Sequence, residues 1–555
     1  MHIYEEYYRE ITGPDGRVER IETTVPENFN FAYDVTDRFA AERPDKPAML
    51  HIGIDGSVTR FTFGDLKRYS DTAAWSLAKL EVGAGTPVML LLKRRSEFWI
   101  AMLALHKLGA IAVPTSHMVS AEDIRKRAET AGVKVILCVN SEHICEKVEQ
   151  AVKNTAVVPV AVGKPYDGFR FWDEMLAGSS VAGVWKRVRT HREDAMLYYF
   201  TSGTNGAPKA VIHDFSYPVA HIYTAKCWHG ITDGDLHLTV ADSGWAKTAW
   251  GKLYGQWFLG ACILVYDYDR FYSGEFLKLI TECRVNTFCA PPTIYKYLVN
   301  EDLRLYDWSY LHHAATAGEP MPPVVANKFA EATGVVVRDG FGQTETALQI
   351  CTPIGGKPVP GSIGKASPQY RIELRDENNN PVPDGEEGEI VLLPNDGKRP
   401  VGVFCGYLGE PERYRDVWRD GVYHTGDRAR RDADGNFFFV GRGDDVIKSS
   451  GYRIGPSEVE DLLLQHPAVA SCAVTGYPSR TRGTVVKASV VLREGYTGDS
   501  RLTNSLQDYV KTHGAVYKYP RIIAYVDELP HTASGKINRA AIRREDEEAF
   551  LRDQK

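Results

Sequence analysis

A segment rich in glycine and hydroxyl residues follows the apolar run at 196–200. It reads Thr201-Ser202-Gly203-Thr204-Asn205-Gly206-Ala207-Pro208-Lys209. Glycines let backbone N–H groups approach phosphate oxygens, hydroxyls donate hydrogen bonds, and a lysine neutralises charge. The segment lacks the G-x-x-x-x-G-K-[ST] spacing of a Walker A loop. These residue types favour phosphate binding, and the alternative is a surface loop without a ligand.

A second segment joins an aromatic ring to a carboxylate and reads Asp339-Gly340-Phe341-Gly342-Gln343-Thr344-Glu345-Thr346. An aromatic ring between glycines can stack on a flat base, and the threonine can contact a phosphate. The glutamate can hold Mg²⁺ through oxygen. Taken alone, these residues are explained equally well by a plain turn.

Three further segments carry polar groups at predicted turns. The first reads Tyr423-His424-Thr425-Gly426-Asp427, and its carboxylate could accept both hydroxyls of a ribose or form an Asx turn. The second, 441–453, is rich in Gly, Asp and Ser where the composition changes, which suits a hinge. The third, 532–536, is a loop of small residues that presents Lys536.

Alternating apolar runs and helical periods predict the elements that position these segments. Strands are expected at 88–92, 110–114, 133–139 and 285–290, with helices at 97–108, 121–131 and 276–283. Such alternation implies parallel sheets covered by helices, whose ligands bind beyond the carboxyl ends of the strands.

The chain changes character twice toward its C-terminus. From about 370, short alternating strands separated by turn residues predict a β-rich subdomain with hairpins. After about 445, helices at 457–465 and 502–512 and strands at 468–476, 485–492 and 521–526 predict a small α+β unit. We therefore expect an α/β protein with a large N-terminal domain, 1–443, and a small mobile C-terminal domain, 444–555, with its hinge near Asp444.

Composition narrows the possible partners and the compartment. The 555 residues are 43% hydrophobic and 25% charged, which is typical of a globular protein and excludes a mostly disordered chain. The net charge of −6 gives no overall positive field for nucleic acid or an anionic membrane. The nine cysteines have no ligand spacing, and no apolar run suits a signal peptide or membrane span. A soluble cytoplasmic protein with free thiols is expected.

Together and in this order, the five segments resemble the adenylate-forming superfamily of acyl-CoA synthetases, adenylation domains and luciferases. TSGTNGAPK is similar to its phosphate loop, FGQTE to its adenine and Mg²⁺ motif, YHTGD to its ribose motif, GRGDDVIKSSGYRIGPSEVE to its hinge motif and SGK to its catalytic lysine motif. The resemblance covers roughly 30–545 and is greatest to medium-chain acyl-CoA synthetases. It implies ATP, Mg²⁺ and coenzyme A as cofactors and a small carboxylic acid as substrate, with a homodimer left open.

The resemblance also implies a role for each matching residue. Lys536, Thr204, Glu345 and Arg442 would be catalytic, with Glu345 and Thr204 also binding Mg²⁺. The expected ATP and AMP contacts are Thr201, Ser202, Gly203, Thr204, Asn205, Gly206, Ala207, Pro208, Lys209, Gly318, Glu319, Pro320, Asp339, Gly340, Phe341, Gly342, Gln343, Thr344, Asp427, Arg442 and Lys536. The expected CoA contacts are His117, Ser450, Gly451, Tyr452, Arg453, Arg482, Lys511, Tyr519 and Arg521.

The acyl site is expected in the segment Ala241–Trp250, which is rich in indoles. Gly244, Trp245, Lys247 and Gly318 would contact the acid. Large rings should shorten the pocket and favour short, medium, branched or aryl acids over long chains. Core packing is the alternative for Trp250 and Trp257, and Lys247 could pair with a polar substrate tail or with a structural carboxylate.

Three other functions compete with an acid–CoA ligase. An adenylation enzyme that loads a carrier protein shares the motifs, but no carrier domain is expected after Lys536. A P-loop kinase needs Lys followed by Ser or Thr, which is absent at Lys209. A nucleotide-binding module without activity would need neither Lys536 nor a CoA tunnel.

Overall fold

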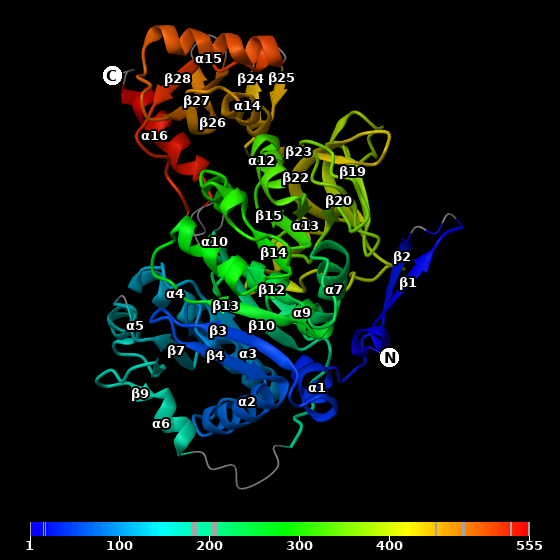
Figure 1. Cartoon of the computed structure of the whole chain (residues 1–555), viewed down its shortest axis with the longest axis vertical. Helices are drawn as coiled ribbons and strands as arrows, with labels where there is room; N and C mark the ends of the chain where they lie inside the picture. The colour runs from blue at the N-terminus through cyan, green and yellow to red at the C-terminus, as the bar shows by residue number, and fades with distance from the viewer. Residues whose placement is uncertain are drawn as a thin grey trace.

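The computed structural model describes residues 2–14, 16, 18–141, 143–178, 186–202, 208–443, 445–449, 452–479, 483–514, 516–532 and 536–552. These residues form a large body of sheets and helices, a smaller β-sheet beside it, and a compact C-terminal unit at the top of Figure 1. The predicted α/β class, with parallel sheets and a small C-terminal α+β unit, is confirmed.

The first large sheet carries the start and the end of the phosphate segment. Its inner strands are parallel, whereas β10 and β11 form an antiparallel hairpin. Lys209 therefore lies on a strand, which corrects the expectation of a loop throughout 201–209. The strand order is β21 (Gly406–Tyr407), β11 (Pro208–Asp214), β10 (Ala195–Ser202), β6 (Ile111–Pro114), β5 (Pro87–Leu91), β7 (Val135–Val139), β8 (Val158–Val162) and β9 (Arg170–Phe171).

One strand of the second large sheet, β16, leads into the adenine segment. Adjacent parallel strands β15 and β16 have their carboxyl ends at one edge, so Gly318 and Gly342 follow neighbouring strands. The strand order is β18 (Lys365–Ala366), β17 (Ile350–Cys351), β16 (Val337–Phe341), β15 (His313–Ala317), β14 (Thr287–Ala290), β12 (Leu236–Thr239), β13 (Cys262–Tyr266), β3 (Pro47–Ile52) and β4 (Val58–Thr62).

Local signals set the ends of several helices. Thr62 and Asp65 form a capping box before α2, and Ser120 and Asp123 form another before α4. Gly109 ends α3 with φ of 66°, a left-handed conformation that glycine adopts without a Cβ clash. The helices of the large body are α1 (Asp37–Glu42), α2 (Phe63–Ala78), α3 (Ser96–Leu108), α4 (Ala121–Ala131), α5 (Ile144–Val152), α6 (Trp172–Ala177), α7 (Tyr217–Tyr223), α8 (Ala246–Gly251), α9 (Tyr254–Phe258), α10 (Ser273–Glu282), α11 (Pro292–Leu298), α12 (Pro323–Thr333) and α13 (Pro411–Val417).

One apolar core joins the two large sheets. Val88 of β5, Leu103 of α3 and Ile263 of β13 are fully buried in the same cluster. Nearly every residue of α3 is buried, so side chains on all faces of this helix pack into the core. This packing fixes the sheet edges that carry the two motif segments relative to each other.

The β-rich subdomain is an antiparallel sheet. Its strands are β19 (Arg371–Arg375), β20 (Glu387–Leu393), β22 (Tyr423–Arg431) and β23 (Phe437–Arg442). The expected hairpins at DENNNPVPDG and DADGN connect β19 to β20 and β22 to β23. Asp427 and Arg442 are direct cross-strand neighbours in this sheet.

The C-terminal unit has its own apolar core around Val459, Val474 and Val510. A short hairpin of β24 (Ile447–Ser449) and β25 (Tyr452–Ile454) precedes it, and α14 lies beside β23 of the neighbouring sheet. The expected hinge residue Asp444 lies outside the described residues. The main elements are β26 (Val469–Ser479), β27 (Gly483–Leu492), β28 (Ile522–Tyr525), α14 (Pro456–Leu464), α15 (Ser500–His513) and α16 (Arg539–Arg552).

A hairpin of β1 (Tyr8–Thr12) and β2 (Val18–Thr23) stands at the N-terminal side of the molecule (Figure 1). Among the helices in the described ranges, none is both long and apolar enough to cross a lipid bilayer.

Candidate active site

Lys209 and Glu345, which are far apart in the sequence, form an ion pair. Lys209 Nζ lies 2.8 Å from Glu345 Oε1, and the Tyr407 hydroxyl donates to the same oxygen at 2.9 Å. Burial alone would raise the pKa of Glu345, but Lys209 and Tyr407 outweigh it, so the pKa is lowered and the carboxylate is charged. The phosphate segment and the adenine segment therefore meet at a negatively charged oxygen donor.

The start of the phosphate segment presents a buried hydroxyl that has no partner within the described part of the chain. Thr201 Oγ1 is buried, and among the described residues it has no hydrogen-bond partner. A buried hydroxyl without a partner is costly, and a phosphate oxygen would satisfy it. The structure places Thr201 and Lys209 at paired positions of β10 and β11, whereas Gly203, Thr204, Asn205, Gly206 and Ala207 lie outside the described residues.

The predicted ribose aspartate is almost completely buried. Asp427 is 4% exposed, and burial raises its pKa to about 6. The charge of Arg442 and a hydrogen bond from Gln343 act in the opposite direction. The carboxylate is therefore ionised near neutral pH, as an acceptor for hydroxyl groups must be.

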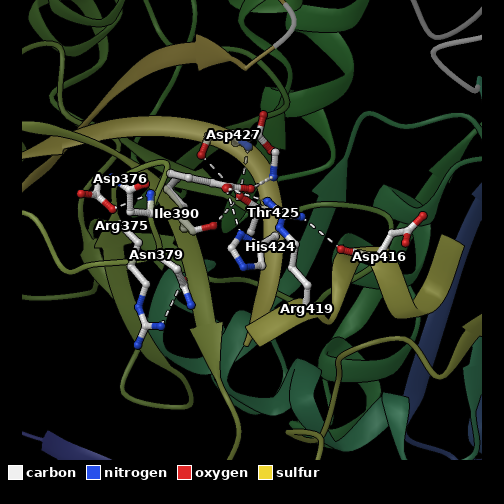
Figure 2. A network of polar contacts seen from close by, with 12 residues as sticks. Arg375, Asp376, Asn379, Ile390, Asp416, Arg419, His424, Thr425 and Asp427 are labelled. Carbon is white, nitrogen blue, oxygen red and sulfur yellow. Dashed lines mark hydrogen bonds and ion pairs between the residues drawn. The ribbon is translucent and has the colours of Figure 1, made fainter. Parts of the chain in front are cut away.

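A polar network holds the turn that carries Asp427 (Figure 2). Glu389 accepts a hydrogen bond from the Gly426 amide at 2.9 Å, and its other oxygen lies 2.9 Å from His424 Nδ1. The Thr425 hydroxyl donates to the Ile390 carbonyl at 2.7 Å. These bonds join β22 to β20 and fix the backbone of the turn.

Lys536 reaches from the C-terminal unit to the edge of the second large sheet. A methyl group built on Gly318 would lie 3.9 Å from Lys536 Cε. Burial is the main influence on the pKa values of Asp427 and Lys247, and the nearby charge of Lys536 also acts on both, in the direction that lowers them. The lysine motif therefore lies beside the other motifs, although Ala533, Ser534 and Gly535 are outside the described residues.

Two glycines of the adenine segment are packed against indole rings. A Cβ on Gly342 would lie 2.3 Å from Trp250 and one on Gly340 would lie 2.6 Å from Trp228. Larger residues at either position would displace an aromatic side chain. Trp250 and Trp228 also contact each other edge to face, with ring centroids 6.5 Å apart.

Trp257 beyond the predicted acyl segment and Trp245 within it differ in their surroundings. Trp257 is fully buried and donates to the Ala48 carbonyl at 2.9 Å, so core packing is the correct interpretation for this residue. Trp245 is half-buried and caps α8. Gly244 approaches the backbone of Ser116 so closely that a Cβ would lie 2.1 Å from its nitrogen.

Lys247 is a buried lysine next to Gly318. Its Nζ donates to the Ala317 carbonyl at 2.9 Å, and burial lowers its pKa. Among the described residues, no carboxylate forms an ion pair with Lys247, so a role toward the substrate stays a prediction. The Lys247 amino group lies at the end of β15.

The other residues of the adenine segment have mainly structural contacts. Asp339 accepts hydrogen bonds from the backbone of Met321 at 3.0 Å and of Gly340 at 2.8 Å, and burial raises its pKa to about 7. Phe341 is half-buried with its ring centroid 5.9 Å from that of Phe439. The Thr344 carbonyl lies 2.7 Å from His213 Nε2.

The GEP segment lies at the same edge of the sheet. Gly318 has φ of 110°, which a residue with a side chain rarely adopts. The charge of the following residue, Glu319, contributes to raising the pKa of Arg539 in the C-terminal unit. Pro320 comes next, before Met321.

Three of the predicted CoA contacts form one cluster on the C-terminal unit. Lys511 Nζ and Arg521 Cζ lie 4.6 and 4.9 Å from the Tyr519 ring centroid, and Arg521 donates to the Tyr519 hydroxyl at 2.8 Å. His117 lies instead on the large body, 3.0 Å from Asp242. Ser450, Gly451 and Arg482 are outside the described residues, and Tyr452 and Arg453 are on β25.

The sequence motifs did not identify several residues that hold the site together. Tyr407 binds Glu345, Glu389 binds the ribose turn, and His213 contacts the adenine segment. Each lies on a strand next to a motif rather than in one. In the sequence, each appears only as a polar residue in or beside an apolar run. The alternation of apolar and polar residues does not show which partner such a residue contacts.

A large α/β body and a small C-terminal unit with a lysine at their junction define an adenylate-forming enzyme. Residues 36–408 match the model of the AMP-binding enzyme family, and residues 458–536 match that of the AMP-binding enzyme C-terminal domain. The chain belongs to the AMP-binding enzyme family.

Two relatives extend this similarity over nearly the full chain. It is 38% identical to the mitochondrial acyl-coenzyme A synthetase ACSM4 of Mus musculus over 95% of this chain and 92% of the relative. It is 37% identical to the mitochondrial acyl-coenzyme A synthetase ACSM5 of Homo sapiens over 94% of this chain and 91% of the relative.

Two solved structures share the fold. The anthranilate CoA ligase AuaEII, solved with anthranoyl-AMP, has a TM-score of 0.87 and 28% identity, with 95% of this chain and 99% of that chain covered. A benzoate CoA ligase from Burkholderia xenovorans has a TM-score of 0.82 and 25% identity, with 93% of this chain and 100% of that chain covered.

Proposed function

We propose that this chain is an ATP-dependent acyl-CoA synthetase. It activates a carboxylic acid as acyl-AMP with release of pyrophosphate and then transfers the acyl group to CoA, which leaves AMP. The observation that carries the proposal is the convergence of Lys209, Glu345, Asp427 and Lys536 from separate segments. The acyl-CoA synthetase relatives support the same reaction.

The chemistry explains why the site contains several basic side chains. A carboxylic acid has a pKa of about 4, so it is already ionised at pH 7 and needs no general base. The obstacle is the approach of this anion to a triphosphate. Lys536, Arg442 and Lys209 would reduce the repulsion and stabilise the charge that develops at the α-phosphate. Lys536 beside Gly318 suits a bridge between the carboxylate and that phosphate.

The nucleotide contacts follow from the positions of the motifs. Thr201 and Lys209 would hold the terminal phosphates, and Phe341 would stack on adenine. Asp427 would accept the ribose hydroxyls, with Arg442 beside it. The other residues proposed to contact ATP or AMP, as the resemblance implies, are those of 202–208, Gly318 to Pro320 and Asp339 to Thr344.

Glu345 fits a magnesium ligand. It is a buried, charged oxygen donor, and Mg²⁺ in nucleotide sites takes one or two carboxylates together with phosphate oxygens. Mg²⁺ would neutralise phosphate charge during adenylation. Lys209 and Tyr407 hold the Glu345 carboxylate in place, and Thr204 is proposed as the second protein ligand.

The tryptophans at the adenine segment point to a short acyl pocket. Trp250 packs against Gly342 and Trp228 against Gly340, and if the acyl group enters beside this segment, these indoles would take up the space that a long chain needs. We therefore propose an acid with a short, branched, medium or aryl acyl group. Trp245, Gly244, Lys247 and Gly318 are proposed to contact it.

The two half-reactions need different residues of the C-terminal unit. Lys536 serves adenylation, whereas the CoA thiol, with a pKa near 8.5, mainly needs a tunnel to the adenylate. We propose that the domain 444–555 turns about Asp444 between the two steps. His117, Ser450 to Arg453, Arg482, Lys511, Tyr519 and Arg521 would then contact CoA. A homodimer and a cytoplasmic location remain predictions.

Product analysis tests the proposed reaction. The enzyme is incubated with ATP, Mg²⁺ and a panel of C2–C12, branched and aryl acids, with and without CoA, and AMP, ADP, pyrophosphate and thioester are quantified. We expect AMP, pyrophosphate and thioester in equal amounts with CoA. ADP formation, or turnover independent of the acid, would contradict the proposal. Thioester on an added carrier protein but not on CoA would favour the carrier-loading enzyme.

A further inference from the structure

The Gln343 side chain joins the adenine segment to the ribose turn. Its Nε2 donates to the Thr425 carbonyl at 2.8 Å and to the Asp427 carboxylate oxygen Oδ2. Its Oε1 accepts a hydrogen bond from the Tyr423 hydroxyl at 2.8 Å. All three partners belong to the segment 423–427, although Gln343 follows β16 of a different sheet.

These partners determine which way the amide points. A backbone carbonyl and an ionised carboxylate can only accept hydrogen bonds, so the amide nitrogen must face Thr425 and Asp427. The amide oxygen then faces the Tyr423 hydroxyl, which can donate. The opposite orientation would place oxygen against two acceptors, and the site is buried, with Tyr423 2% and Asp427 4% exposed.

The other contacts of the ribose turn act on its backbone or its neighbours. Glu389 binds the Gly426 amide. The Thr425 hydroxyl binds the Ile390 carbonyl of β20 (Figure 2). Neither of these contacts reaches the Asp427 carboxylate. Gln343 does, and its hydrogen bond favours the ionised form. It therefore orients the group that would meet the ribose and, together with the charge of Arg442, favours its ionised form.

We propose that Gln343 is a positioning residue for ribose recognition rather than a contact of the adenine base. It holds the Asp427 carboxylate in the orientation that accepts the hydroxyls of the nucleotide sugar, and Tyr423 in turn fixes the Gln343 amide. This inference rests on the proposed role of Asp427 as the ribose acceptor. It adds a specificity role for Gln343 and Tyr423.

The distinguishing consequence is loss of sugar discrimination. If Gln343 orients Asp427, Gln343→Leu weakens AMP binding but changes 2′-deoxy-AMP binding much less, because the deoxy sugar offers less to the carboxylate. A hydrogen bond to a charged group corresponds to a factor of roughly 10 to 100. We expect the dissociation constant of 2′-deoxy-AMP divided by that of AMP to fall roughly tenfold. If Gln343 contacts adenine, AMP and 2′-deoxy-AMP weaken equally.

The experiment measures binding by calorimetry in the absence of acid and CoA, so that catalysis does not contribute. The ligands are AMP, 2′-deoxy-AMP, 3′-deoxy-AMP and IMP, and the variants are Gln343→Leu, Tyr423→Phe and Gln349→Leu. Gln349 is the matched control because it bonds to Thr346 at 2.8 Å in the same segment and does not contact Asp427. Tyr423→Phe should lower sugar discrimination by a smaller factor and decides the question if Gln343→Leu does not fold.

A selective loss of sugar discrimination in Gln343→Leu, absent in Gln349→Leu, supports the proposal. Equal weakening of AMP and the deoxynucleotides, or a loss of selectivity for AMP over IMP, overturns it. Asp427→Ala tests separately the assumption that Asp427 accepts the ribose hydroxyls. If this variant still discriminates ribose from deoxyribose, the proposed role of Asp427 is wrong, whatever the result for Gln343.

Discussion

The nucleotide side and the CoA side of the site hold their polar groups in different ways. Asp427 and Glu345 are 4% and 8% exposed and have defined hydrogen-bond partners. The cluster of Lys511, Tyr519 and Arg521 lies at the surface, where the Lys511 side chain is 35% exposed. Buried groups act at short range in a low dielectric, whereas exposed charges are screened. Removal of a single polar side chain should therefore matter far more on the nucleotide side.

The largest effect is expected for Lys536→Ala. Loss of one preorganised stabiliser of the transition state should lower the rate of acid-dependent adenylation by a factor on the order of 10² to 10³. Release of pyrophosphate in a single turnover measures this step. Thioester formation from supplied acyl-adenylate should persist.

Gly451→Trp is the counterpart on the CoA side. Its indole should obstruct the pantetheine tunnel, so adenylation should continue while thioester formation stops. Equal loss of both half-reactions in both variants would contradict the idea that the C-terminal domain presents different residues in turn.

The next effect concerns the acyl pocket. Trp250→Leu should open space beside Gly342 and raise kcat/KM for longer acids relative to short ones, by roughly 10-fold or more, since one methylene in an apolar pocket corresponds to 10- to 200-fold discrimination. Chain-length profiles of CoA-dependent AMP release measure the ratio. Trp75→Leu on the surface of α2 is the control, and an unchanged profile for Trp250→Leu would exclude Trp250 from the pocket.

The buried ribose carboxylate predicts a pH dependence. Burial raises the pKa of Asp427 to about 6, so the carboxylate gains a proton and loses acceptor capacity as the pH falls below that value. KM for ATP should then rise by up to about tenfold per pH unit. Steady-state kinetics between pH 5 and 8 measure the effect. In Asp427→Asn, KM for ATP should be high and nearly independent of pH. If KM for ATP in this variant still rises as the pH falls, as in the wild type, another group causes the pH dependence.

Buried neutral histidines predict loss of stability in acid. Burial lowers the pKa of His106 to about 3, against 6.5 for an ordinary histidine. The unfolded chain therefore binds a proton that the folded chain excludes. This stabilisation is complete above pH 6.5 and is lost as the pH falls toward 3, at about 1.4 kcal/mol per pH unit.

His106→Gln isolates that contribution from other buried groups. Asp339 acts with the opposite sign, because burial raises its pKa to about 7. The glutamine amide can still reach the Tyr254 hydroxyl, which lies 3.2 Å from the histidine ring nitrogen. Urea unfolding at pH 5 and pH 7 should show a smaller acid loss in the variant, and an identical loss would contradict a neutral His106.

The smallest effect is expected on the CoA side. Lys511→Ala should raise KM for CoA only a few-fold, because an exposed ion pair contributes about 0.2–1 kcal/mol. The increase should shrink further in high salt. Initial rates at varied CoA and salt measure it. An effect as large as that of Lys536→Ala would show that Lys511 becomes buried when CoA binds.

Sequence patterns located most of the fold. The strands and helices between 88 and 139 lie within about two residues of prediction, because continuous apolar runs, capping residues and Gly109 mark them. The antiparallel β10–β11 hairpin was not foreseen, since the pairing of a strand depends on partners distant in the sequence.

The site was predictable to the level of motifs but not of contacts. Glu345 and Asp427 were singled out because five segments in this order resemble one family, and their roles stay predictions. Tyr407 and Glu389 could not be found, since their partners lie 62 and 37 residues away along the chain. Likewise, the motif placed Gln343 among the nucleotide contacts but could not show that its side chain bonds to the ribose turn.

Transfer of oxygen from the acid to AMP tests the central claim most directly. A substrate acid labelled with ¹⁸O in its carboxylate is converted with ATP and CoA, and the products are analysed by mass spectrometry. Attack of the carboxylate on the α-phosphate, followed by displacement by the thiol, predicts one ¹⁸O atom in each AMP. Unlabelled AMP, or label in orthophosphate with ADP, would contradict an acyl-adenylate intermediate.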